Sequence, residues 1–76
     1  MSSLRNAQKS LAVNVKRLRL AKGITQEELA FLADIDRTYA SQIERAKANP
    51  SLGIICAVAD ALGTTYEKLL AEIKLT

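Results

Sequence analysis

The sequence predicts a small all-α fold of five helices. The chain has 76 residues, of which 49% are hydrophobic, and this is enough for one modest core, so we expect residues 1–76 to form a single domain. Only three Gly and one Pro are present, a composition that favours helices over turn-rich sheets. Helix-capping residue types also recur just before apolar residues spaced three and four positions apart.

The first helix is predicted to end at Lys22, because Gly23 readily adopts the left-handed conformation that terminates helices. Its core stripe is Leu11, Val15 and Leu18, at spacings of four and three. Residues 1–3 are expected to be loose, as chain termini often are.

The second helix has an unusually complete start signal. Thr25 is a good N-cap, and Glu28, three residues later, can close a capping box, so the helix should begin at Gln26. It should stop at Asp34, a residue type that tolerates the left-handed conformation. Its predicted apolar side consists of Leu29, Ala30, Leu32 and Ala33.

A third helix should follow over residues 37–45, with Ala40 and Ile43 facing the core. Asp36 precedes it and has two interpretations: its carboxylate caps the helix, or it accepts a hydrogen bond from a cytosine amino group. We favour the cap, because capping needs no partner molecule.

The fourth helix is predicted over residues 52–62. Pro50 disfavours helix at the residue before it, Ser51 can cap the new helix, and Gly63 ends it. Cys56 is expected to be a buried small hydrophobic side chain. The predicted core residues of this helix are Leu52, Ile55, Val58, Ala59 and Leu62.

The fifth helix should run from Tyr66 to about Ile73, after Thr65 as its N-cap. Leu69 can complete the core, but Tyr66, Leu70 and Ile73, together with Leu75, leave more apolar surface than a short terminal helix should expose to water. We therefore expect a homodimer interface here, in preference to packing of the same residues within one chain.

Composition excludes several classes of protein. The single Cys cannot form an internal disulfide, and without any His the usual zinc sites cannot be assembled, so we expect no metal and no cofactor. The lack of His and of an evident pair of carboxylates also argues against an enzyme. No apolar run suggests a signal peptide or a membrane span, and we expect a cytoplasmic protein.

The positive charges are concentrated at one end. Six cationic residues precede Glu27, the first acidic one, and this asymmetry suggests a polyanionic partner, although a solvated helix face would give the same pattern. We expect one or two of Lys9, Lys16, Arg17 and Lys22 to contact phosphates, and our choice is Arg17.

The second and third helices are joined by a break too short for an antiparallel pair, as in a helix-turn-helix. Ala30 is small where the two backbones would cross closely. The outward face of the third helix carries hydrogen-bonding side chains that can contact base edges in a major groove, rather than the Glu and Lys of a solvated helix. These are Arg37, Thr38, Ser41, Gln42 and Arg45.

The segment "TQEELAFLADIDRTYASQIERAKANPSL" resembles the helix-turn-helix of the phage repressor and Cro-like (Xre) regulators, and "DRTYxSxxER" is most similar to the controller proteins of restriction-modification systems. The resemblance spans roughly residues 11–70. It implies a sequence-specific transcription regulator that binds a partly symmetric DNA operator as a homodimer. Asp34 and Ala46 depart from the pattern, which has Gly at both positions, and a left-handed Ala would be strained.

The resemblance also implies roles for individual residues. Base contacts fall on Arg37, Thr38 and Gln42, with Ser41 as a further candidate. Gln26, Tyr39, Arg45 and Asn49 match positions that contact the DNA backbone. Arg19 and Glu44 match an ion pair that braces the first helix against the third.

Two other functions compete with the controller type. A prophage repressor would use the same surface, whereas an antitoxin-like module would use its apolar C-terminal helix to bind a partner protein. RNA polymerase is a further candidate partner through Glu27, because Glu28 is already explained by the capping box.

Overall fold

The computed structural model describes residues 2–73 and has five helices and no strand in that part of the chain. Helix α1 spans Ser3–Lys22, α2 spans Gln26–Ala33, α3 spans Arg37–Glu44, α4 spans Leu52–Leu62 and α5 spans Tyr66–Leu70. None of these helices is both long enough and apolar enough to cross a membrane. The five-helix prediction is confirmed.

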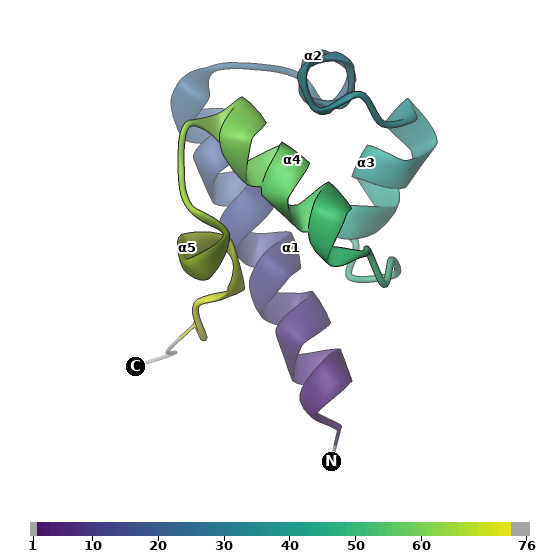
Figure 1. Ribbon diagram of the computed structural model, residues 1–76, viewed down its shortest axis with the longest axis vertical. Coiled ribbons are helices and arrows are strands. Elements are labelled where there is room, and N and C mark those ends of the chain that lie inside the picture. Colours follow the sequence, from purple (N-terminus) through teal and green to yellow (C-terminus); the bar gives the residue numbers. More distant parts are fainter. Residues whose placement is uncertain (1, 74–76) are drawn as a thin grey trace.

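The long helix α1 packs against α3, α4 and α5, whereas α2 lies at one end of the molecule against α3 and α4 (Figure 1). Helices α2 and α3 pack against each other, α2 also packs on α4, and α3 and α5 both contact α1. The common core lies between these helices, and Val15, Leu29, Val58 and Leu69 are its largest fully buried side chains.

The ends of most helices follow the predicted local signals. Gly23 and Gly63 end α1 and α4 with φ values of 74° and 68°. The side chains of Ser51 and Thr65 cap α4 and α5 by accepting hydrogen bonds from backbone N–H groups three residues later. Glycine tolerates the positive φ at the ends of α1 and α4 because it has no Cβ.

The first and last helices differ from the prediction at their outer ends. Ser2 caps α1 through its hydroxyl, which accepts a hydrogen bond from Arg5 N, so α1 begins at Ser3, within the stretch predicted to be loose. Helix α5 ends at Leu70, three residues before the predicted Ile73. The reason is a long-range contact: the Asn14 side chain donates hydrogen bonds to the carbonyl oxygens of Leu69 and Ala71, both at 2.9 Å. Leu75 lies outside the described residues.

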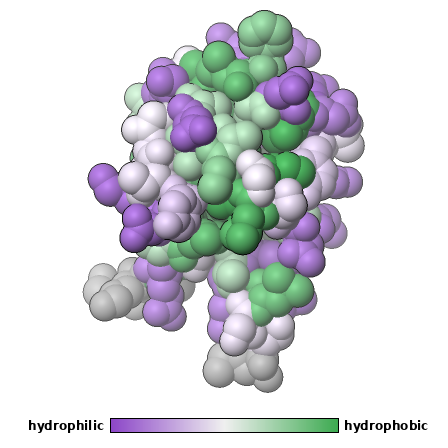
Figure 2. All heavy atoms as spheres, in the orientation of Figure 1, coloured by the Kyte–Doolittle hydropathy of each residue, from purple (hydrophilic) through white to green (hydrophobic). Residues whose placement is uncertain are grey.

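Three predicted core residues are on the surface. Leu32 is half exposed, Leu52 is 73% exposed, and Cys56 is exposed and not buried as expected. Helix α4 is apolar on nearly every side, so its periodicity could not identify the face that packs inward. Figure 2 shows hydrophobic side chains over α4 in the middle of the visible face.

Candidate DNA-binding surface

The helix-turn-helix unit is formed by α2, the connection at residues 34–36, and α3. Asp34 takes up the left-handed conformation at φ 56° and ends α2, and Ile35 N donates a hydrogen bond to Ala30 O at 2.9 Å across the turn. Ala30 is 4% exposed, and Ile43 of α3 is buried in the common core. The turn and the small buried residue thus fix α3 against α2.

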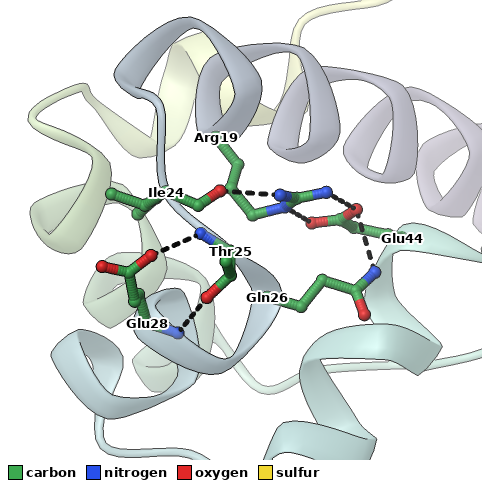
Figure 3. A network of polar contacts seen from close by, with 6 residues as sticks. All are labelled: Arg19, Ile24, Thr25, Gln26, Glu28 and Glu44. Atoms are coloured by element: carbon green, nitrogen blue, oxygen red, sulfur yellow. Dashed lines mark hydrogen bonds and ion pairs between the residues drawn. The ribbon is translucent and has the colours of Figure 1, made fainter.

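The N-terminus of α2 has a complete capping box. Thr25 Oγ1 accepts a hydrogen bond from Glu28 N at 3.0 Å, and Glu28 Oε1 accepts one from Thr25 N at 2.9 Å (Figure 3). These two bonds satisfy backbone donors that a helix start leaves free. The predicted start of α2 at Gln26 is confirmed.

A polar network connects three helices behind the unit. Arg19 of α1 and Glu44 of α3 form an ion pair with Nε and Oε2 2.6 Å apart and a second bond of 3.1 Å from Nη2 to Oε1. Arg19 Nη1 also donates to Ile24 O at 2.7 Å, and Gln26 Nε2 donates to Glu44 Oε1 at 3.2 Å (Figure 3). The network therefore fixes both α3 and the start of α2 to α1.

The charge of the Arg19 guanidinium is secured by the same contacts. The hydrogen bond to Glu44 raises the pKa of Arg19 above its ordinary value, the negative charge of Glu44 adds to the effect, and burial opposes it. Since the ordinary value is already far above neutral pH, Arg19 stays cationic at any pH at which the fold would be studied.

The outward face of α3 is polar and accessible. We call the five side chains predicted to face outward the recognition surface: Arg37, Thr38 and Arg45 are exposed, and Ser41 and Gln42 are half-buried. Arg37, Thr38, Ser41 and Arg45 line one hollow together with Gln26, so α2 and α3 present their polar groups to the same space. Ala40 and Ile43 face inward as predicted.

Asp36 does not cap α3. It occupies the N-cap position with extended backbone, but its side chain makes no capping hydrogen bond and is exposed. The preferred interpretation of Asp36 is therefore wrong, and its carboxylate remains accessible next to the recognition surface. No local pattern indicated this, because Asp is among the best N-cap residues.

The other residues predicted to contact the DNA backbone differ from one another in exposure and in position. Asn49 is exposed in the loop after α3, whereas Tyr39 is half-buried and packs against the core. Arg17 lines a hollow with Lys68 of α5, and its Nη2 approaches Asn14 Oδ1 at 3.5 Å. Arg17 does not line either of the two hollows that α2 and α3 share.

The loop after α3 keeps a left-handed residue. Ala46 has φ 58°, although it carries a Cβ. Such a conformation costs roughly 1–2 kcal/mol for a residue other than Gly. The loop therefore retains the expected left-handed position and accepts the strain.

The residues predicted to form the dimer interface differ in how far they are exposed. Tyr66 is 51% exposed, whereas Leu70 is half-buried and packs against the core. Ile73 is half-buried, lies beyond the end of α5 and lines the hollow that contains Arg17. Leu52 and Cys56 add apolar surface on α4 that the helical periodicity had assigned to the core.

Residues 15–69 match the family model described as helix-turn-helix. The chain is 45% identical over 60 residues to the "hypothetical transcription factor" of Neisseria meningitidis, and the match covers 79% of this chain and 57% of that protein. It is 46% identical over 57 residues to the control protein C.BamHI of Bacillus amyloliquefaciens, covering 74% and 70%.

Two further similarities extend the range of relatives. The immunity repressor of Bacillus phage phi105 is 40% identical over 58 residues, which are 76% of this chain and 40% of the repressor. The crystal structure of the restriction-modification controller protein C.AhdI from Aeromonas hydrophila superposes with a TM-score of 0.79 at 39% identity, covering 82% of this chain and 94% of that one. The chain thus spans just over half of the Neisseria protein and less than half of the phage repressor.

Proposed function

Because the chain belongs to the helix-turn-helix family of DNA-binding transcription regulators, we propose that it binds a partly symmetric operator as a homodimer and reads the bases with α3. The recognition surface is the observation that carries this proposal. Its side chains are hydrogen-bonding groups on the open side of α3, while the core and the Arg19–Glu44 pair hold the other side. A helix presented in this way fits a major groove.

Each side chain of the recognition surface has a definite chemistry to offer. Arg37 can donate two hydrogen bonds to guanine O6 and N7, and Gln42 can pair with adenine N6 and N7. Thr38 and Ser41 can donate to or accept from either type of base pair. The carboxylate of Asp36, which makes no capping bond, can accept a hydrogen bond from a cytosine amino group, and this is the role we propose for Asp36.

Backbone contacts would set the register of the protein on DNA. The first turn of α2 points free backbone N–H groups and the positive end of the helix dipole outward, so Gln26 is suited to bind a phosphate. Arg45 and Asn49 would bind the backbone at the other end of α3, with Tyr39 and Arg17 as further candidates. These contacts contribute affinity and orientation but little sequence preference.

Controller-type regulation is the form we propose, in which the protein controls genes of a restriction-modification system. Support comes from the similarity to C.BamHI and C.AhdI, which are control proteins. The similarity to a phage immunity repressor keeps prophage regulation as the second candidate. Both functions require the same recognition surface and differ in the genes that carry the operator.

A homodimer would place two copies of α3 about one turn of DNA apart, roughly 34–36 Å. The exposed Tyr66 and the half-buried Leu70 and Ile73 support self-association through the C-terminal segment. The apolar outer face of α4, with Leu52 and Cys56, offers additional surface for the same contact.

RNA polymerase is the second partner we propose. Phe31 of α2 is 85% exposed and lines a hollow with Ile24, Leu32 and the carboxylates of Glu27 and Glu28. An exposed aromatic group beside the carboxylate of Glu27 would suit a basic protein segment with an apolar anchor. Changing Phe31→Ser should therefore leave operator affinity intact and reduce activated transcription in vitro, and equal transcription by both proteins would remove polymerase from the proposal.

Selection of bound sequences from a random duplex DNA pool at physiological salt tests the function. Enrichment of a two-fold-related motif with half-sites about one turn apart is the expected result. Arg37→Ala and Gln42→Ala should each then lower affinity for that motif by about 1–3 kcal/mol and relax the preference at one base position. Retention of the whole pool without enrichment, abolished on addition of salt, would contradict sequence-specific binding.

A further inference from the structure

Asn14 is a buried polar residue on the core side of α1 that the recognition surface does not use. It lies three positions after Leu11 and four before Leu18, both of which pack in the core, and it is only 4% exposed. A buried amide costs free energy unless its polar atoms are hydrogen-bonded, whereas an apolar side chain would need no partner. The presence of Asn among apolar neighbours therefore points to a specific role for its hydrogen bonds.

The shortest hydrogen bonds of Asn14 reach the C-terminal end of the described chain. Its Nδ2 carries two hydrogens and donates to both Leu69 O and Ala71 O, at 2.9 Å each. Its Oδ1 accepts a longer hydrogen bond of 3.5 Å from Arg17 Nη2. The side-chain amide thus ties α1 to the end of α5, which packs beside it (Figure 1).

The two accepting carbonyls lie on either side of Leu70, where α5 ends. The last carbonyls of a helix have no partner within the helix, and in a helix that continued to Ile73 the Leu69 carbonyl would accept from the Ile73 N–H. Asn14 takes the place of that donor, and Ala71 has an extended backbone. The amide of Asn14 thereby fixes both the end of α5 and the direction in which the chain leaves it.

This direction decides where the apolar residues of the C-terminal segment lie. A continuous helix would place Tyr66, Leu70 and Ile73 on one face, because their spacings are four and three. In the structure Ile73 lies beyond the end of α5 and lines a hollow together with Leu18 of α1. The apolar surface at this end of the molecule is therefore shared between α5 and the segment that Asn14 holds against α1.

We infer that Asn14 is a positioning residue for self-association. Its hydrogen bonds hold Leu70 and Ile73 in the arrangement that a second copy of the chain would contact, and Asn14 itself need not touch that copy. This inference rests on the proposed homodimer. A two-fold interface brings the same surface of both copies together, so a segment with several arrangements would have to be ordered in each copy on association. Asn14 orders the segment during folding, before the second copy binds.

Two substitutions of Asn14 in the full chain test this role. Asn14→Leu keeps a branched side chain but removes its polar atoms, and Asn14→Ser leaves a single hydroxyl, so neither side chain can donate two hydrogen bonds. Gln8→Met is the matched control, because Gln8 is also an amide of α1 that donates to a distant backbone carbonyl, that of Ala48, at 2.7 Å. Circular dichroism would establish that each variant is folded at the temperature of the measurements.

Sedimentation equilibrium then gives the dissociation constant of the dimer for each protein. Both Asn14 variants should raise that constant by about tenfold, because the loss of one or two hydrogen bonds changes an equilibrium by roughly this factor. Gln8→Met should change it by less than about twofold, because its hydrogen bond lies in the loop after α3 and sites without shared partners act independently.

Operator binding separates positioning from damage to the fold. At protein concentrations below the dissociation constant of the variant dimer, the Asn14 variants should occupy less of the selected operator than the wild-type protein does. Above that constant they should occupy it fully, because mass action restores the dimer. Their base preferences should be those of the wild-type protein, since the recognition surface is unchanged.

A dimer dissociation constant equal to that of the wild-type protein in both Asn14 variants would overturn the inference and leave Asn14 with a role in the monomer fold alone. An equally weakened dimer in Gln8→Met would also overturn it, because the loss would then not depend on the C-terminal segment. Neither outcome would affect the proposed function, since the wild-type protein would still be a dimer that selects its operator. A wild-type protein that stays monomeric on its operator would instead contradict the proposed homodimer, and the inference with it.

Discussion

The N-terminal ends of α2 and α3 are built in opposite ways. Helix α2 begins with a capping box in which Thr25 and Glu28 satisfy each other's backbone donors. Helix α3 follows Asp36, whose side chain makes no capping bond, and it is held by the burial of its own Ala40 and Ile43 and by the Arg19–Glu44 ion pair. The side chains of Thr25 and Glu28 are thus used in folding, whereas the carboxylate of Asp36 at the start of α3 remains available for a ligand.

The largest effect should come from the brace that α3 depends on. Arg19→Met would leave Glu44, whose side chain is only 3% exposed, without its partner, and removing one member of a buried pair costs about 3–5 kcal/mol. Urea denaturation would measure the loss of stability. In hydrogen exchange, α3 amides should lose protection before those of α2.

Lys16→Met, an exposed change on the same helix, provides the control and should alter stability by no more than about 0.5 kcal/mol. If α2 and α3 lost protection together in Arg19→Met, the two helices would share one source of stability and the contrast between them would disappear.

An intermediate effect should distinguish the caps directly. Thr25→Ala should destabilise the protein by about 1 kcal/mol because a backbone donor loses its acceptor. Asp36→Ala should cost only a few tenths of that amount, since no capping bond is broken. Ser51→Ala, which removes the cap of α4, serves as the positive control and should resemble Thr25→Ala.

If Asp36→Ala were as destabilising as Thr25→Ala in the same denaturation experiment, the starts of α2 and α3 would not differ in their dependence on a cap. A stable Asp36→Ala variant with altered preference at one base position would strengthen the contrast between the two starts, because the free carboxylate would then have its function in DNA recognition and none in folding.

The smallest effect concerns the residues that end the two helices. Asp34 after α2 and Ala46 after α3 both have positive φ, but Asp tolerates this conformation better than Ala. Ala46→Gly should therefore stabilise the protein by about 0.5–1 kcal/mol, and Asp34→Gly should give a smaller gain. Thermal denaturation of the two variants side by side would measure the difference, and a larger gain for Asp34→Gly would reverse the expected order.

Local signals predicted the helix ends that depend on local chemistry. Thr25, Glu28, Gly23 and Gly63 each act on a backbone group within a few residues, and the start of α2 and the ends of α1 and α4 were predicted correctly. Ser2 caps α1 by the same local chemistry, but residues 1–3 were predicted to be loose because of their position at the chain terminus.

Most of the wrong predictions concern contacts between distant residues, whereas the absent cap at Asp36 is a local failure. The end of α5 is set by Asn14, more than 50 residues earlier in the chain. The exposure of Leu52 and Cys56 follows from which side of α4 meets α1 and α2, and a helix that is apolar all round does not reveal this choice. The hollow that Arg5 of α1 shares with Lys47 of the loop after α3 was missed for the same reason, because these residues are far apart in the chain.

The bond between Gln26 and Glu44 has a consequence for how DNA would be captured. An amide nitrogen carries two hydrogens, and Gln26 Nε2 uses one on Glu44. The second hydrogen can be offered to a phosphate while the first bond persists. Gln26 would then meet DNA with its rotamer already selected, so that little conformational entropy is lost on binding, and the internal network of the fold acts as preorganisation for the operator.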